Sequence, residues 1–404
     1  MASPPPIDGG VTAPSGFRAS GVHCGIKASG KPDLSLIVSD TPASAAGLFT
    51  INLAKAAPLF LCQDHLKRSG GYARAIVTNS GCANACTGPQ GEKDAREMVE
   101  LTAAAVGCNQ EQVLVASTGV IGVHLKMDAI RAGIPMAAKA LDARGGAAAA
   151  RAIMTTDPFP KEYAIEVDTK MFGSFRVGGM AKGSGMIEPR MATMLGYLTT
   201  DATVEPRMLS RALTEAARYT FNAITVDGEP STNDCVFALA NGASGVTINE
   251  HLYAAFVEAL RAVAHELALG IVRGGEGATK LIAITVTGAA TDADAWMAAR
   301  AIANSPLVKT AVHGGDPNWG RLVAAAGRSG AKFVLDGARV QIGSLVLFEN
   351  GRPFDELAPK AADYLTGKDL AITVDLGAGG SHRATVWTCD LSAEYVKINA
   401  EYRT

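Results

Sequence analysis

Apolar residues recur three and four positions apart in five segments of the chain, a spacing that predicts amphipathic helices. The five segments are 92–106, 127–141, 207–220, 251–272 and 293–303. Short runs of aliphatic and β-branched residues lie between and after these segments and predict strands. The predicted strands are 34–39, 73–78, 112–116, 163–167, 175–177, 225–227, 281–286, 331–335, 339–342, 345–348, 370–375 and 383–388.

Helices and strands are mixed along the chain without the strict alternation of a doubly wound sheet. This order favours an α+β fold, with a layered αββα-type body. The glycine-rich stretch 273–280 ends the longest predicted helix, and the pattern after residue 304 is mostly β. We therefore expect a smaller, β-rich C-terminal α/β domain over about residues 281–404.

Composition and charge narrow the class of protein. The chain has 404 residues, 48% hydrophobic and 19% charged, which is typical of a globular protein. Its net charge of −2 and pI near 6.4 provide no basic field for nucleic acid or an anionic membrane. The apolar stretch 252–272 carries four ionisable residues, so it predicts an amphipathic helix and no membrane span. Residues 1–10 contain no Lys or Arg and no apolar run, so no signal peptide is expected.

Cysteines and common motifs point to no metal or nucleotide site. The seven cysteines are scattered, and the close pair Cys82 and Cys86 has no second pair to complete a zinc site. They are expected to be reduced thiols of a cytoplasmic protein. The seven histidines form no cluster, and the chain lacks the G-x-S-x-G, H-E-x-x-H, Walker A and Rossmann signatures.

The most unusual stretch is residues 180–195, with the sequence MAKGSGMIEPRMATML. It contains four methionines and a lysine around two glycines, and Pro189 excludes a regular helix just before Thr193. Taken alone, it predicts a glycine turn that leads into an apolar strand or helix.

This stretch resembles the cleavage-site signature of the ornithine acetyltransferase family, also called glutamate N-acetyltransferase, of arginine biosynthesis. Other segments along the chain are similar to the same family, in the same order. They are 9–14, 16–19, 49–52, 56–58, 79–81, 83–88, 117–122, 222–228, 231–234, 274–280, 315–321 and 396–404. The resemblance thus covers essentially the whole chain.

The resemblance implies that the chain cuts itself between Ala192 and Thr193. The Thr193 hydroxyl would attack the Ala192 carbonyl, and hydrolysis of the ester would leave an α chain, 1–192, and a β chain, 193–404. Residues 193–280 would complete the core of the body. A threonine hydroxyl needs a neighbouring base. Cleavage supplies one, because the freed α-amine has an ordinary pKa of about 7.7–8.0.

The implied reaction is a ping-pong transfer that needs no cofactor. Thr193 takes the acetyl group from N-acetylornithine, ornithine leaves, and glutamate accepts the acetyl group from acetyl-Thr193. The family resemblance also implies an α2β2 assembly. The sequence leaves open whether acetyl-CoA is a second acetyl donor.

Further site residues carry over by position from the family. Thr118 and Gly119 are implied to stabilise the oxyanion of the tetrahedral intermediate, which needs preorganised donors. Besides Thr193, the implied substrate-binding residues are Thr155, Lys182, Glu276, Asn399 and Thr404. Sequence alone does not separate Thr155 from Thr156.

Two other hypotheses remain at this point. An aminopeptidase or amidase with an N-terminal nucleophile uses the same self-processed hydroxyl, and differs in passing the acyl group to water. A non-catalytic binding protein would keep an uncut chain. In segment 315–321, Trp319 is expected to be packed and Arg321 paired, without a catalytic role.

Overall fold

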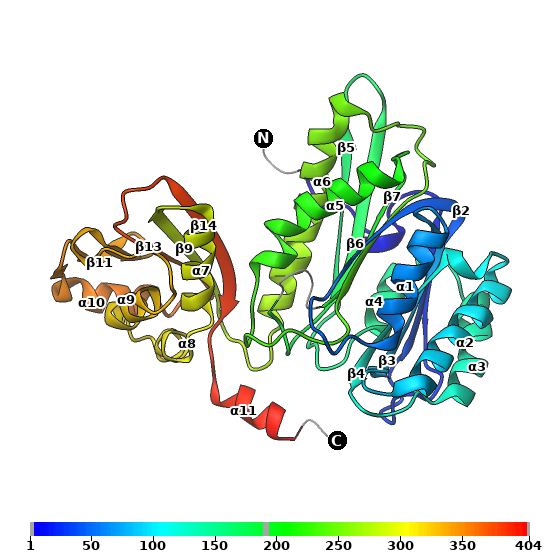
Figure 1. Cartoon of the computed structure of the whole chain (residues 1–404), viewed down its shortest axis with the longest axis horizontal. Helices are drawn as coiled ribbons and strands as arrows, with labels where there is room; N and C mark the ends of the chain where they lie inside the picture. Colours follow the sequence, from blue (N-terminus) through cyan, green and yellow to red (C-terminus); the bar gives the residue numbers. More distant parts are fainter. Residues whose placement is uncertain (1–3, 189–193, 402–404) are drawn as a thin grey trace. The chain divides into compact units, whose positions relative to one another are not determined.

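The computed structural model describes residues 4–188 and 194–401, which form two compact units (Figure 1). Unit 1 consists of Met1–Gly183, Pro189–Asn222 and Pro230–Ile271. Unit 2 consists of Ser184–Glu188, Ala223–Glu229 and Val272–Thr404. Each unit is therefore assembled from segments that are far apart in the sequence.

Unit 1 is built on an eight-stranded sheet with the order β4-β3-β2-β8-β7-β6-β5, and β1 pairs with β2 outside this path. Most neighbours are antiparallel, whereas β3 with β4 and β7 with β8 are parallel. The strands are β1 Phe17–Val22, β2 Leu34–Phe49, β3 Tyr72–Cys82, β4 Val113–Val120, β5 Lys161–Asp168, β6 Ser174–Lys182, β7 Leu195–Thr200 and β8 Cys235–Ala240.

Strand β2 connects two halves of this sheet. Its first part pairs with β1 and β3, and its last part pairs with β8, with a register shift between Val38 and Ala43. The hydroxyls of Thr78 on β3 and Tyr197 on β7 are 2.8 Å apart. In a flat sheet these strands would be separated by three spacings, or roughly 14 Å. The sheet therefore folds over, and its two halves face each other.

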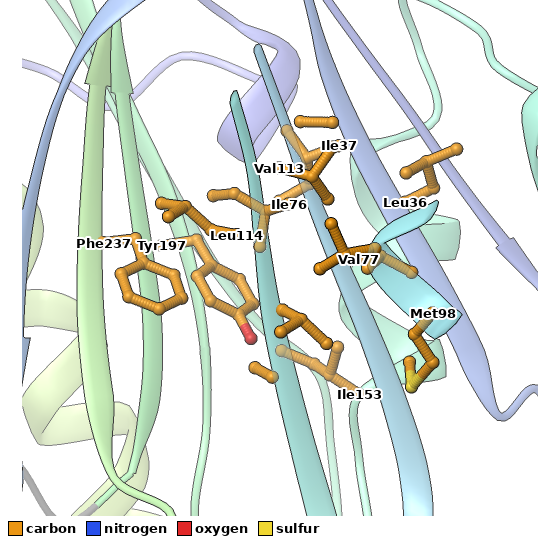
Figure 2. Close-up of a cluster of buried hydrophobic side chains, with 14 of the residues drawn as sticks. Leu36, Ile37, Ile76, Val77, Met98, Val113, Leu114, Ile153, Tyr197 and Phe237 are labelled. Carbon is orange, nitrogen blue, oxygen red and sulfur yellow. The ribbon is translucent and has the colours of Figure 1, made fainter. Parts of the chain in front are cut away.

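The space between the two halves is filled by apolar side chains. Figure 2 shows Ile76 and Leu114 of β3 and β4 opposite Tyr197 and Phe237 of β7 and β8. The rings of Tyr197 and Phe237 are stacked, with centroids 5.9 Å apart. This buried cluster is the main core of unit 1.

Six helices cover the sheet of unit 1. α1 and α2 contact β4, α3 and α4 contact β1 and β2, and α5 contacts β2. α6 packs on β6 through Phe256 and Phe175, whose centroids are 6.0 Å apart. The result is the expected layered αββα-type body. The helices are α1 Ala57–Arg68, α2 Gly88–Val106, α3 Met127–Lys139, α4 Gly146–Ala152, α5 Pro206–Arg218 and α6 Glu250–Arg273.

Unit 2 has a six-stranded sheet with the order β12-β11-β10-β13-β9-β14. Alternate residues of β9 are buried, and α7 packs on β9 and β14 while α9 contacts β10 and β13. The strands are β9 Leu281–Ala289, β10 Arg339–Ile342, β11 Leu345–Glu349, β12 Arg352–Pro353, β13 Asp369–Asp375 and β14 His382–Cys389. The helices are α7 Asp292–Ala303, α8 Pro306–Gly314, α9 Trp319–Gly327, α10 Ala358–Tyr364 and α11 Ala393–Ala400.

Short 3-10 turns occur at Gly10–Thr12, Gln110–Gln112, Phe221–Ala223, Leu335–Gly337 and Asp355–Leu357. In the part of the chain that the structure describes, no helix is both long enough and apolar enough to cross a membrane.

All five predicted helices are confirmed, with ends shifted by a few residues. Two predicted strands are wrong. Residues 225–227 form a loop whose backbone makes single bonds to neighbouring segments, such as that from the Thr225 amide to the Trp387 carbonyl. Residues 331–335 lead into a 3-10 turn, and the Val334 amide donates to the Leu376 carbonyl at 2.9 Å without a ladder of further bonds to that segment. Val226 is buried without pairing in a strand ladder, whereas Val334 and Leu335 are 40% and 49% exposed, so their apolar run marks no buried strand.

Candidate active site

The end of β4 carries the predicted oxyanion residues, Thr118 and Gly119, and buried amides hold this end of the strand. The side-chain amide of Asn233 donates to the carbonyls of Ala83 and Ser117, the latter at 2.9 Å. The Ser117 hydroxyl in turn donates to the Asn79 side-chain oxygen at 2.6 Å. These side chains are buried, so the backbone before Thr118 is held firmly.

Gly119 has a φ of +132°, a region that L side chains rarely adopt. A Cβ atom at this position would lie 2.3 Å from the carbonyl carbon of Gly81 and 2.6 Å from the amide nitrogen of Cys82 on β3. Both contacts are with backbone, which cannot rotate away. Glycine is therefore required for the close approach of β3 and β4.

Lys182, the last residue of β6, brings two predicted site residues together. Its ammonium donates to the hydroxyl of Thr155 at 2.8 Å and to that of Thr118 at 3.2 Å. Lys182 and Thr118 are each 8% exposed, so water screens these contacts weakly. The hydrogen bond also selects Thr155 over Thr156 as the threonine that faces Lys182.

A buried ion pair lies directly behind this lysine. The Asp157 carboxylate is 2.6 Å from the Lys161 ammonium and 3.9 Å from that of Lys182. It also accepts the backbone amides of Thr155 at 3.0 Å and Gly183 at 2.8 Å. We call Thr118, Thr155, Asp157, Lys161 and Lys182 the Lys182 cluster.

Opposing effects set the ionisation of the cluster. Burial raises the pKa of Asp157, but the charges of Lys182 and Lys161 outweigh it and hold the pKa well below the usual range. Burial lowers the pKa of Lys161, and the charge of Asp157 opposes this shift. The carboxylate is therefore ionised at neutral pH and lies between two lysines. This arrangement favours an anionic ligand over a cationic one.

Two further ionisable side chains belong to this region of unit 1. The Lys27 ammonium donates to the Met154 carbonyl at 2.7 Å, and burial lowers its pKa to about 8. Asp234 is 3% exposed, and its Oδ2 has no hydrogen-bond partner among the described residues. Burial raises the pKa of Asp234 well above its usual value, against the hydrogen bond from Ser231 and the charge of Lys182.

In unit 2, the predicted residues Glu276 and Asn399 form a hydrogen-bonded pair. The Asn399 side-chain amide donates to the Glu276 carboxylate at 2.8 Å, and Glu276 is only 6% exposed. The Glu276 amide donates to the Ser184 carbonyl at 2.9 Å. A Cβ atom on Gly185 would lie 2.4 Å from the Glu276 carboxylate, so a glycine leaves the space that the carboxylate occupies.

The residues before the predicted cut are held firmly in unit 2. The Ser184 hydroxyl donates to the Gly274 carbonyl at 2.6 Å, and the Asp227 carboxylate accepts the Ile187 amide at 2.8 Å. The Glu188 carboxylate accepts a hydrogen bond from the Arg300 guanidinium at 2.9 Å. The segment 184–188 is therefore held in unit 2 by side-chain and backbone hydrogen bonds.

The structure brings Thr118, Thr155 and Lys182 together in unit 1 and Glu276 and Asn399 together in unit 2. The remaining predicted site residues, Ala192, Thr193 and Thr404, lie outside the described residues. Trp319 stacks on Phe348 and Arg321 donates to the Leu307 carbonyl, as expected for packed and paired residues.

Sequence reasoning missed Asp157, Lys161, Asn233 and Lys27. Two of them had a usable signal, because Asp157 directly follows the Thr155–Thr156 pair and Asn233 lies in segment 231–234, which resembles the family. Lys27 had none, since its bond to Met154 depends on a distant segment, and no motif marked Lys161 although its partner Asp157 is only four positions away. All seven cysteines are free thiols. Among the described residues, no group of three or more His, Cys, Asp or Glu side chains could hold a metal ion.

Comparisons with known proteins cover the whole region that carries these residues. The model of the ArgJ family matches residues 18–404. The arginine biosynthesis bifunctional protein ArgJ of Symbiobacterium thermophilum is 52% identical over 405 residues, which cover 98% of this chain and 99% of that protein. The protein of the same name from a Synechococcus species is 49% identical over 410 residues, 98% of each. A crystal structure of ornithine acetyltransferase with ornithine, from Mycobacterium tuberculosis, is 44% identical and covers 47% of this chain and 100% of that chain, with a TM-score of 0.44.

Proposed function

The chain belongs to the ArgJ family, and on that basis we propose that it transfers the acetyl group of N-acetylornithine to glutamate after cutting itself before Thr193. As a member of this family it is an acyltransferase of arginine biosynthesis. The Lys182 cluster is the observation that supports the proposed acetyl transfer. In it a buried lysine, at the end of the strand that precedes the cleavage segment, donates to the hydroxyls of both Thr155 and Thr118.

Self-cleavage is the first step of the proposal. The Thr193 hydroxyl attacks the Ala192 carbonyl, the peptide bond breaks, and water hydrolyses the resulting ester. The products are the α chain, 1–192, and the β chain, 193–404, and two copies of each form the α2β2 assembly. Ser184–Glu188 is hydrogen-bonded within unit 2, and β7, which belongs to unit 1, begins at Leu195.

Acetyl transfer then uses the freed α-amine of Thr193 as the base. The amine takes the hydroxyl proton, the Thr193 oxygen bonds to the acetyl carbon, and the C–N bond of N-acetylornithine breaks. The proton passes to the departing ornithine amine, and acetyl-Thr193 remains. Glutamate attacks this ester through its amino group and restores the hydroxyl. No cofactor takes part in these steps.

The other predicted residues receive roles that match their chemistry. Thr118 and Gly119 stabilise the oxyanion, a role in which the loss of one donor typically lowers kcat by about 10²–10³. Lys182 pairs with a substrate carboxylate, and Thr155 contacts the substrate beside it. Glu276, supported by Asn399, and Thr404 bind the amino-acid substrates, with Glu276 on an amino group.

Intact mass and N-terminal sequencing of the purified protein test the cut. We expect two chains, the second beginning at Thr193. Thr193→Ala should leave a single uncut chain without activity, whereas Thr193→Ser keeps a hydroxyl and should retain part of both functions. A second chain that begins at another residue would refute the proposed nucleophile.

The transfer itself is tested with N-acetylornithine, with and without glutamate. Ornithine and N-acetylglutamate should form together, and only when glutamate is present. Acetate release at the same rate without glutamate would instead indicate an amidase. Because the relatives are named bifunctional, formation of N-acetylglutamate from acetyl-CoA and glutamate is the matching test for a second donor.

A further inference from the structure

Asp157 is the buried charge around which the Lys182 cluster is organised, although none of the roles proposed above belongs to it. Its side chain is fully buried. One carboxylate oxygen accepts the Gly183 amide at 2.8 Å and lies 2.6 Å from the Lys161 ammonium. The other accepts the Thr155 amide at 3.0 Å and lies 3.9 Å from the Lys182 ammonium. A single carboxylate thus joins the segment 155–161 to the end of β6.

The geometry assigns Asp157 to a positioning role: we propose that it holds Lys182 and Thr155 in the orientation that binds the carboxylate of the amino-acid substrate. This inference rests on the proposed function, because it presumes that Lys182 and Thr155 contact substrate. Asp157 itself acts through these two residues and through the backbone.

Three contacts support the assignment. The bond to the Thr155 amide fixes the backbone of the residue whose hydroxyl accepts from Lys182 at 2.8 Å. The bond to the Gly183 amide fixes the residue that follows Lys182. The charge of Asp157 then opposes any movement of the Lys182 ammonium away from this position.

Because Lys161 also pairs with Asp157, the Asp157 carboxylate can position Lys182 without neutralising its charge. The side chain of Lys161 is 2% exposed, and its ammonium makes the shorter of the two ion pairs with Asp157. The single charge of Asp157 is therefore shared between Lys161 and Lys182, so one positive charge remains for a substrate anion. Two buried lysines and one carboxylate give a net positive site.

The test compares steady-state constants for N-acetylornithine in processed enzyme. Asp157→Asn keeps the shape of the side chain and removes its charge. It also leaves Lys161 buried without a partner, which can unfold the chain. A second variant, Asp157→Asn with Lys161→Met, removes both charges, so no unpaired charge is buried and the chain should fold. Asp201→Asn is the matched control, because Asp201 is also buried and accepts two backbone amides, those of Ser15 and Arg176.

We expect KM for N-acetylornithine to rise about tenfold or more in the Asp157 variants while kcat stays within about threefold, the pattern of lost ground-state binding. The Asp201 variant should show a wild-type KM. An unchanged KM in the folded double variant would overturn the inference. So would equal losses in the Asp157 and Asp201 variants, or a folded Asp157 variant that fails to cut itself.

Lys182→Met separates this inference from the proposed function. If Lys182→Met raises KM and the Asp157 variants do not, the positioning role fails and the proposed function stands. If wild-type enzyme does not transfer acetyl groups, or Lys182→Met leaves KM unchanged, the proposed role of the cluster itself fails.

Discussion

Replacement of Gly119 by alanine is the sharpest test of the proposed oxyanion site, because the structure specifies what the added carbon meets. The new Cβ would lie 2.3 Å from one backbone atom of β3 and 2.6 Å from another, in a residue with a φ of +132°. Since β3 and β4 pair in register up to this point, the end of β4 has to move away from β3.

The expected cost of Gly119→Ala has two parts. A non-glycine residue in a sparsely populated backbone region costs about 1–3 kcal/mol. Overpacking against atoms that cannot move aside costs a further 1–3 kcal/mol, approximately. The free energy of unfolding should therefore fall by about 2–6 kcal/mol, a large part of the roughly 5–15 kcal/mol typical of a folded protein.

Gly122→Ala provides a matched control in the turn that follows β4. Gly122 also has a positive φ, +79°, but a Cβ there would meet nothing within 4 Å. Gly122→Ala should therefore lower the free energy of unfolding only by the backbone strain, about 1–2 kcal/mol. The difference between the two variants therefore isolates the contact between the strands.

Urea unfolding measures the stabilities, and the initial rate of ornithine release measures activity. Displacement of the oxyanion donors at Thr118 and Gly119 should lower kcat by about 10²–10³, whereas Gly122→Ala should retain most of it. The reasoning is refuted if Gly119→Ala proves as stable as Gly122→Ala, or if its kcat stays within about threefold of wild type.

Two further predictions concern single side chains of the proposed site. Gly185→Ala should raise KM for the amino-acid substrates by about tenfold. The added Cβ would lie 2.4 Å from the Glu276 carboxylate and would displace it. An unchanged KM in steady-state assays would contradict the proposed substrate-binding role of Glu276. Asp157 should make the free energy of unfolding depend on pH in acid. Its pKa is lowered on folding, so the unfolded chain binds more protons than the folded chain. The free energy of unfolding therefore falls as the pH drops below the unfolded pKa of about 3.9. The doubly substituted Asp157→Asn, Lys161→Met chain should lose this contribution to the pH dependence, which urea titrations between about pH 2 and 5 would detect.

Several elements with a clear apolar period were predicted from the sequence, although α1 and β1 were missed. The helix at Gly88–Val106 and the strand at Leu281–Ala289 show the apolar period that a half-buried element requires. Strands β7 and β8 were missed; every residue of both is buried, so neither shows alternation, whereas the equally buried strand at 34–39 was predicted from its Leu-Ile-Val run. The loop at 225–227 was mistaken for a strand, since buried apolar residues there look the same as a short strand.

Site prediction met a similar limit. Thr118, Thr155 and Lys182 were identified by resemblance, and the structure places their side chains in contact. Asp157 was not identified, because its role follows from a bond to Gly183, 26 positions later in the chain. Its place after Thr155 and Thr156 was a signal, but its partners at the end of β6 become known only when distant segments are folded together.

The strand order of unit 1 leads to a prediction about the cut protein. β7 and β8 belong to the proposed β chain, yet they lie between β2 and β6, which belong to the proposed α chain. Ser44–Phe49 pairs with Cys235–Ala240, and Val177–Lys182 pairs with Leu195–Thr200, so both edges of the β7–β8 pair are hydrogen-bonded to the other chain. Cleavage before Thr193 therefore breaks one covalent bond and no ladder of the sheet. Native mass spectrometry should find α and β chains only together, and denaturing gels should separate them. A free, folded α chain in native solution would show that this strand order does not survive the cut.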